Sequence, residues 1–184
     1  YVSSVAESIR NFWKTYSKPQ VLVFSFHGIP KRSLLKGDPY HCQCHKTARL
    51  IANELHLDDH EWKICFQSRF GKAEWLKPYT SETIIDMARG GITDINVVCP
   101  GFISDCLETL EEIALELKED FLSAGGINFR YIPCLNDSKL GISMLTNLIE
   151  EETSGWDSTN ESFASKKKNV ENQRKRALEL GADN

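Results

Sequence analysis

Histidine and carboxylate side chains follow the predicted strands of this chain at the points where each strand ends. His27 closes an apolar run at 21–26, and Asp105 comes shortly after another run at 95–99. In an open parallel sheet, ligands bind beyond the carboxyl ends of the strands. An imidazole can accept a proton or bind a transition metal near neutral pH, and carboxylates suit hydrated divalent ions. The sequence therefore predicts a site for proton transfer or metal binding at one end of a sheet.

Polar and aromatic side chains in two further loops are expected at the same end. The run at 62–68 ends in Gln67 and Ser68, with Trp75 close behind. Phe102 follows the next predicted strand. Because the carboxyl ends of parallel strands meet at one end of the sheet, we expect these loops to converge with His27.

Three acids in the segment after that strand lie on one side of a predicted helix. Asp105, Glu108 and Glu112 are spaced i, i+3 and i+7. In one interpretation they form an ordinary helix start, with Asp105 as the N-cap and Glu108 completing a capping box. In the other, a divalent cation relieves the repulsion among three like charges. The spacing alone leaves both interpretations open.

A second group of metal-binding residue types lies within five consecutive positions. His41, Cys42, Cys44 and His45 supply two thiols and two imidazoles. The spacing is not C-x2-C, and no second Cys/His pair follows at the distance typical of zinc fingers. A zinc staple and simple packing at the start of a helix are both interpretations of this cluster.

The order of apolar patterns predicts an α/β fold. Short, nearly continuous apolar runs are typical of strands buried on both faces, and here they alternate with helical patterns. This alternation predicts a four-stranded parallel sheet with helices on both faces. The predicted strands are 21–26, 62–68, 95–99 and 127–132, and the predicted helices are 4–16, 41–55, 80–89, 105–122 and 140–149. The helix at 105–122 is expected to pack through an apolar stripe of Leu107, Leu110, Ile113, Ala114 and Leu117.

Composition and missing motifs exclude several classes of protein. The chain has 184 residues, 41% of them hydrophobic and 26% charged, which is typical of a globular domain. A net charge of -4 argues against a dedicated nucleic-acid binder. Dinucleotide, nucleotide, serine-hydrolase and zinc-protease signatures are absent from the sequence. No apolar run approaches the roughly 18 residues of a membrane span. The spacing of the six cysteines favours a reduced, cytoplasmic protein.

The composition changes near residue 150. We expect residues 1–149 to form the α/β domain, and residues 150–184 to form a polar tail that is either disordered or a solvated helix. The first residue is Tyr1 rather than methionine, and it lies in what looks like the middle of a helix. This start favours a chain that begins partway through a longer protein.

Four motifs in a fixed order carry a resemblance to a known family. They are S-F-H-G-I-P at 25–30, G-D-P-Y at 37–40, Q-S-R-F-G at 67–71 with W-L-K-P-Y-T at 75–80, and P-G-F at 100–102 with D-C-L-E-T-L-E-E at 105–112. Across about residues 1–149 the chain resembles ferrochelatases of the proteobacterial type, which insert Fe(2+) into protoporphyrin IX in the terminal step of heme biosynthesis.

The resemblance implies two similar Rossmann-like domains with the porphyrin cleft between them. This chain corresponds to the second, so an N-terminal domain of the same protein is expected as its partner. Protoporphyrin IX and ferrous iron are the expected substrates, with no required cofactor and no nucleic acid. Some members carry an iron-sulfur cluster on C-terminal cysteines, but no cysteine follows Cys134 here and none is expected. Peripheral contact of the protein with a membrane stays open.

Individual roles also follow from the resemblance. It implies His27 and Glu108 as catalytic residues, and it groups Asp105 and Glu112 with them as residues that hold or guide the metal. Whether His27 acts as a base or as a metal ligand stays open. The helix that carries these acids is expected to be wider than an α-helix, a π-type distortion often found at functional sites. The residues expected to bind the porphyrin are Trp75, Phe102, Tyr79, Gln67 and Ser68.

Two alternatives remain beside this function. One is a chelatase of the same architecture that acts on a more polar tetrapyrrole, although the motifs at 67–80 and 100–112 favour ferrochelatase. The other is a non-catalytic module that binds metal or porphyrin. The activity of the isolated chain stays open, since a fold alone does not establish a function.

Overall fold

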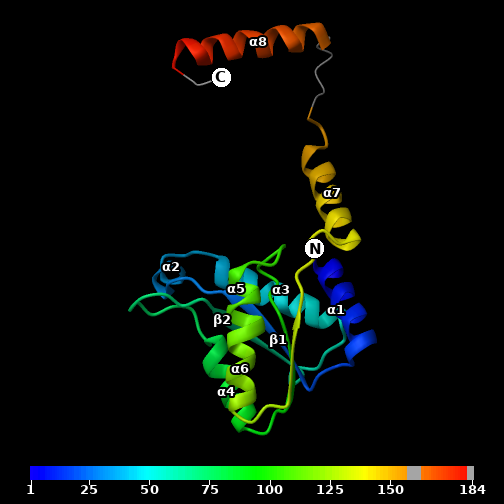
Figure 1. Cartoon of the computed structure of the whole chain (residues 1–184), viewed down its shortest axis with the longest axis vertical. Helices are drawn as coiled ribbons and strands as arrows, with labels where there is room; N and C mark the ends of the chain where they lie inside the picture. The colour runs from blue at the N-terminus through cyan, green and yellow to red at the C-terminus, as the bar shows by residue number, and fades with distance from the viewer. Residues whose placement is uncertain (157–162, 182–184) are drawn as a thin grey trace. The chain divides into compact units, whose positions relative to one another are not determined.

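The computed structural model of the chain describes residues 1–156 and 163–181. The chain forms two compact units, Tyr1–Thr146 and Asn147–Asn184. The first unit contains the sheet and every residue predicted for the site (Figure 1). The second contains the end of α7 (Lys139–Thr153) and helix α8 (Phe163–Glu179), which is exposed along 167–179.

Four parallel strands form one sheet in the order β2-β1-β3-β4, which confirms the predicted fold class. The central strand β1 is buried along 21–26, as a nearly continuous apolar run requires. Its register pairs His27 with Gln67, so these two residues lie side by side at the carboxyl end of the sheet. The strand bounds are β1 Val21–His27, β2 Trp62–Gln67, β3 Asp94–Val98 and β4 Asn128–Ile132.

Helices cover both faces of the sheet, as predicted, because each face buries its own hydrophobic cluster. Helix α1 (Val2–Tyr16), α3 (Tyr40–Glu54) and the start of α7 pack on one face. Helix α4 (Thr80–Arg89), the π-helix η1 (Glu112–Leu117) and α6 (Lys118–Ser123) pack on the other. Figure 1 shows α4 and α6 side by side. Two short helices, α2 (Lys31–Leu35) and α5 (Leu107–Leu110), lie in the connections.

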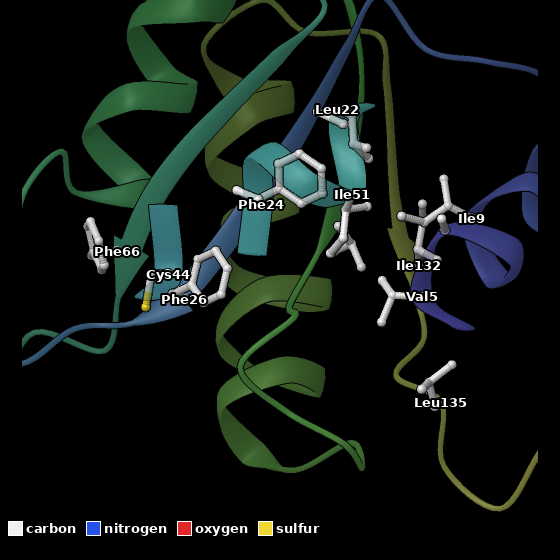
Figure 2. Close-up of a cluster of buried hydrophobic side chains, with 14 of the residues drawn as sticks. Val5, Ile9, Leu22, Phe24, Phe26, Cys44, Ile51, Phe66, Ile132 and Leu135 are labelled. Atoms are coloured by element: carbon white, nitrogen blue, oxygen red, sulfur yellow. The ribbon is translucent and has the colours of Figure 1, made fainter. Parts of the chain in front are cut away.

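Aromatic and branched side chains fill the core on the face covered by α1 and α3 (Figure 2). Phe24 and Phe66 from the two paired strands are almost fully buried, as are Ile9 of α1 and Ile51 of α3. Fully burying a side chain of this size contributes roughly 1.5–3 kcal/mol. This packing fixes β1 and β2 against the helices, and therefore fixes the positions of the strand ends.

The prediction of one continuous helix at 105–122 is wrong. The segment forms α5, η1 and α6 in succession, and the widened turn is closed by a hydrogen bond from the Glu116 N–H to the Glu111 oxygen at 3.0 Å. The predicted N-cap is also wrong, because α5 begins at Leu107 with Cys106 as its N-cap. The π-type helix that the family resemblance implied is confirmed.

The apolar stripe predicted for that helix is only partly buried. Ile113 and Leu117 are buried, but Leu107 is 72% exposed and Leu110 is 50% exposed. A π-turn contains one more residue than an α-turn, so it rotates the residues before it relative to those after it. An α-helical period therefore cannot describe both halves of the segment.

Candidate active site

His27 lies at the end of β1 and is half-buried. Its Nδ1 is 2.7 Å from the Gly28 oxygen. Because a carbonyl oxygen only accepts hydrogen bonds, Nδ1 carries the proton in this contact, and Nε2 is left for another partner. The ring centroid lies 6.2 Å from that of Trp75 and 6.4 Å from that of Phe102. The structure thus brings together three residues that the sequence placed in three separate loops.

Gly28 allows the loop after β1 to pass close to β2. Its N–H donates to the Gln67 oxygen at 2.8 Å. A Cβ at this position would lie 2.9 Å from that oxygen and 3.1 Å from Trp75 Cε3. Such contacts are too close for any other residue without a shift of the backbone. The absence of a side chain at Gly28 therefore lets this loop lie close to Gln67 and Trp75.

Glu108 lies in α5 and shares the carboxyl end of the sheet with His27. A hydrogen bond from the Cys106 thiol is the main reason why the pKa of Glu108 is below its usual value, and attraction to His27 lowers this pKa further. The two predicted catalytic residues are thus close enough to interact electrostatically. The carboxylate of Glu108 stays ionised at neutral pH beside an imidazole with a free Nε2.

The loop after β2 holds Glu112 at the start of η1. The Ser68 N–H and the Ser68 hydroxyl each donate to one carboxylate oxygen of Glu112 at 2.6 Å. Gln67 is buried, and its Nε2 donates to the backbone oxygen of Glu108 at 2.6 Å while its Oε1 accepts from the Ser25 hydroxyl at 2.7 Å. These bonds join the end of β2 to the junction between α5 and η1. Substrate binding by Gln67 and Ser68 stays a prediction.

Asp105 is surrounded by hydrogen-bond donors of the protein. One oxygen accepts from the Tyr131 hydroxyl at 2.6 Å and from the Thr109 hydroxyl at 3.1 Å, and the other accepts from Asn136 Nδ2 at 2.7 Å. The Cys134 N–H also donates, at 3.3 Å. Burial raises the pKa of Asp105, but these hydrogen bonds outweigh burial and hold the pKa below its usual value. Asp105 connects the loops that follow β3 and β4, and its role in guiding metal stays a prediction.

Tyr79 lies at the end of the loop that carries Trp75. The Arg69 guanidinium is 5.0 Å from the centre of the Tyr79 ring, and the Lys77 ammonium is 5.5 Å from it. The Tyr79 hydroxyl accepts from the Trp75 N–H at 3.3 Å. These contacts place Tyr79 against the loop that carries Trp75, and its role in binding the porphyrin stays a prediction.

Two hollows lie along the acidic helix. The first has a volume of about 310 Å³ and is lined in part by Tyr79, Glu112 and Glu116. The second is a more open groove of about 480 Å³, lined in part by Phe70, Glu108, Glu112 and Glu116. Glu116 lines both, although the sequence analysis did not select it. The signal was present, because Glu108, Glu112 and Glu116 recur at every fourth position.

Tyr40 is a second residue that the sequence analysis missed. It begins α3, and its hydroxyl donates to the backbone oxygen of His27 at 2.8 Å. Burial raises the pKa of this hydroxyl, so it remains a donor. Tyr40 belongs to the G-D-P-Y motif at 37–40, but no spacing rule predicts a contact with the end of β1.

The structure does not bring the two cysteines and two histidines at 41–45 together as the zinc staple considered above. Cys42 is exposed, whereas Cys44 is buried in the core. Within residues 1–156 and 163–181, no group of three or more His, Cys, Asp or Glu side chains is placed to hold a metal ion. All six cysteines are free thiols.

A comparison with protein families finds one family that contains these residues. A family model described as Ferrochelatase matches residues 1–153, a range that contains every site residue described above. The chain belongs to the ferrochelatase family. The family resemblance inferred from the four motifs is therefore confirmed.

Named ferrochelatases from several bacteria are similar to this chain. The ferrochelatase of Polaromonas sp. (strain JS666) is 55% identical over 156 residues, which are 85% of this chain and 42% of that protein. The ferrochelatase of Nitrosococcus oceani is 51% identical over 184 residues, covering 99% of this chain and 50% of that protein. The ferrochelatase of Nitrosomonas europaea is 48% identical over 182 residues, covering 99% of this chain and 49% of that protein.

The chain spans about half the length of these ferrochelatases. The two relatives that cover 99% of the chain also match the polar segment after residue 150, which the motifs did not reach. No helix among the described residues is long and apolar enough to cross a membrane. The roles of individual side chains are not tested by these likenesses and stay predictions.

Proposed function

We propose that this chain is the metal-side half of a ferrochelatase that inserts Fe(2+) into protoporphyrin IX to form protoheme. The observation that supports this function best is the placement of the His27 imidazole beside Trp75 and Phe102 at the carboxyl end of the sheet, within electrostatic range of the Glu108 carboxylate. This combines a proton acceptor, an anion and apolar walls at one place. Family membership supports metal insertion in heme biosynthesis as the reaction class.

Insertion requires that two pyrrole protons leave the macrocycle and that the metal exchanges its water for nitrogen ligands. His27 offers Nε2, because Nδ1 donates to the Gly28 oxygen. In this proposal Nε2 accepts a pyrrole proton or ligates the arriving metal. Glu108, which the Cys106 thiol helps to keep ionised, supplies the facing negative charge.

The acids of the widened helix offer oxygens that replace water around the metal. Glu108, Glu112 and Glu116 line one continuous groove, and hard carboxylate oxygens suit a hydrated divalent ion. In this proposal the ion moves along these oxygens towards Glu108. Asp105 supports the path by anchoring its start, since direct contact with the ion would require release of the Tyr131 hydroxyl or the Asn136 amide.

Aromatic side chains are proposed to hold the macrocycle. Trp75 and Phe102 lie beside His27, and Tyr79 packs on the same loop as Trp75. Contact of flat aromatic side chains with the porphyrin faces provides binding energy that can hold the ring bent, so that its nitrogen lone pairs point towards the metal.

The proposal includes a partner domain and a cellular location. Because the related ferrochelatases are about twice as long, we propose that an N-terminal domain of the same protein completes the cleft. Six free thiols support a reduced, cytoplasmic location. Iron enters as a substrate, so the proposal requires no resident cofactor and no nucleic acid.

A chimera tests this function. The chain replaces the matched half of the Nitrosococcus oceani ferrochelatase, with which it shares 51% identity. We expect the chimera to convert protoporphyrin IX and Fe(2+) into protoheme. The loss of porphyrin fluorescence measures this conversion. In His27→Ala, turnover should fall by about 10²–10⁴-fold with the melting temperature unchanged. The exposed His60 provides the control variant His60→Ala, which should retain full turnover.

Three outcomes would contradict the proposal. Full turnover in His27→Ala would remove His27 from the reaction. Faster metal insertion into sirohydrochlorin than into protoporphyrin IX would favour a chelatase for polar tetrapyrroles. A chimera that shifts the porphyrin absorbance without metalating it would favour the binding module.

A further inference from the structure

His41 and His45 form a close pair of imidazoles on the first turns of α3, outside the groove that the acids line. Their ring centroids are 4.4 Å apart, with 46° between the ring planes. Both rings pack against Phe66, His41 in a stacked arrangement at 5.7 Å and His45 at 6.2 Å. Positions i and i+4 share one face of a helix, which is the spacing that lets two histidines bind one metal ion.

His45 Nε2 is buried and has no hydrogen-bond partner. Among the described residues, it is the one buried side-chain nitrogen or oxygen without a hydrogen-bond partner. Leaving such an atom unpaired destabilises the folded protein, so a ligand that binds His45 Nε2 would stabilise it. The site lies beside Phe66, a core residue that Figure 2 labels together with Cys44 and Phe26.

The separation of the two rings suits metal binding. Nitrogens about 2.1 Å from a shared zinc ion place two ring centroids about 5 Å apart, so the observed separation needs only a small adjustment of the rings.

We propose that His41 and His45 bind one divalent cation of the borderline class, such as Zn(2+), Ni(2+) or Fe(2+), through two imidazole nitrogens. Imidazole nitrogens select these ions over Mg(2+) and Ca(2+). The cysteines of the segment take no part: Cys42 is exposed, and Cys44 is buried in the core. The described residues offer no third ligand of the His, Cys, Asp or Glu type at this place, and the start of a helix disfavours a cation. We therefore expect weaker binding than at a site with three or four protein ligands.

Nuclear magnetic resonance of the 184-residue chain tests the proposal, with Zn(2+) as the probe. The background carries His27→Ala and Glu108→Gln, so that metal bound at the candidate active site does not contribute. We expect the imidazole signals of His41 and His45 to shift together and to saturate at one equivalent of Zn(2+), while Mg(2+) shifts neither. Zn(2+) should also raise the melting temperature of this protein, because it binds the folded state.

Matched variants sharpen the test. His41→Phe and His45→Phe keep an aromatic ring against Phe66 but remove the nitrogens, so each should weaken Zn(2+) binding by about tenfold or more. His56 and His60 are also four residues apart, but they are exposed and lie outside the helices. Replacing both by alanine should leave binding unchanged.

The proposal is overturned if the signals of His41 and His45 do not move in the chain with both histidines present. It is also overturned if Zn(2+) shifts the signals of His56 and His60 equally, or if the phenylalanine variants bind Zn(2+) as before. The first measurement needs no substitution at either histidine, so it decides the question even if a phenylalanine variant fails to fold.

Discussion

Asp105 and Glu108 stand three positions apart in the same acidic segment, yet their surroundings differ sharply. Asp105 accepts hydrogen bonds from three side chains and one backbone N–H, which tie it to the loops after β3 and β4. Glu108 lies in the open groove, beside the Cys106 thiol and within electrostatic range of His27. Both have a lowered pKa, but the main lowering contacts differ.

This difference shows that a lowered pKa does not identify a reactive carboxylate. At Asp105 the hydrogen bonds that stabilise the charge also occupy the oxygens that a metal would need. At Glu108 the charge is stabilised while the groove leaves access for an ion. We infer that Asp105 mainly stabilises the fold around the site and that Glu108 mainly serves the reaction.

Replacing Glu108 should give the largest effect on turnover. In the chimera, Glu108→Gln keeps the shape of the side chain but removes the negative charge within electrostatic range of His27, so turnover should fall by about 10²–10⁴-fold. The free energy of unfolding of the 184-residue chain, measured with urea, should change by less than about 0.5 kcal/mol. A large loss of stability with little loss of turnover would reverse the roles of Glu108 and Asp105.

Replacing Asp105 should give the largest effect on stability. Asp105→Asn replaces one accepting oxygen by an amino group that faces donors, so the free energy of unfolding should fall by about 2–3 kcal/mol. Urea unfolding of the 184-residue chain measures this change. At temperatures where the variant stays folded, the chimera should lose less turnover than it does in Glu108→Gln. If Asp105→Asn has the same free energy of unfolding as the parent chain, the hydrogen bonds of Asp105 do not stabilise the fold.

Replacing Glu112 should produce an intermediate result. Its carboxylate lines the groove but also accepts two hydrogen bonds from Ser68. In Glu112→Gln one of these acceptors is lost, which should cost about 1 kcal/mol of stability and reduce turnover by less than in Glu108→Gln. Parallel assays of the two variants in the chimera check this ranking, and equal losses of turnover would break it.

The smallest expected effect is a change in acid stability. Because the pKa of Asp105 is lower in the folded state, its stabilising contribution is fully present above the usual aspartate value of about 3.9 and is lost as the pH falls through the lowered value. The difference in unfolding free energy between the parent chain and Asp105→Asn should therefore shrink between about pH 5 and pH 2. Urea titrations across this range measure it. A constant difference would mean that the charge of Asp105 is not what stabilises the fold.

Much of the fold and of the site was predictable from the sequence, for a physical reason. Nearly continuous apolar runs mark the two central strands, β1 and β3, and the regular alternation with helical patterns marks the other two, so the bounds of all four were placed to within about one residue. His27, Trp75 and Phe102 were expected to meet because parallel strands bring their carboxyl ends together. Long-range contacts were not predictable in this way. The bond from the Tyr40 hydroxyl to the His27 oxygen joins two segments that no periodicity relates.

The acidic helix shows the second limit of sequence patterns. An α-helical period placed Leu107 and Leu110 in the core, whereas the π-turn of η1 leaves both exposed. Capping rules selected Asp105, but the hydrogen bonds from Tyr131 and Asn136 hold that carboxylate outside the helix start. Both errors arise because tertiary contacts outweigh local preferences where the chain builds a site.

The pairing of His27 with Gln67 restricts where this chain can gain or lose residues. Successive side chains of a strand point to opposite faces, so a single deletion within β1 would turn the imidazole to the other face of the sheet. A deletion in the exposed turn at 58–60 lies outside both strands. The side chains of β1 and β2 therefore keep their faces of the sheet and their packing partners in the core. We therefore expect related proteins to vary in length at that turn and to keep the number of residues between Phe24 and His27 constant.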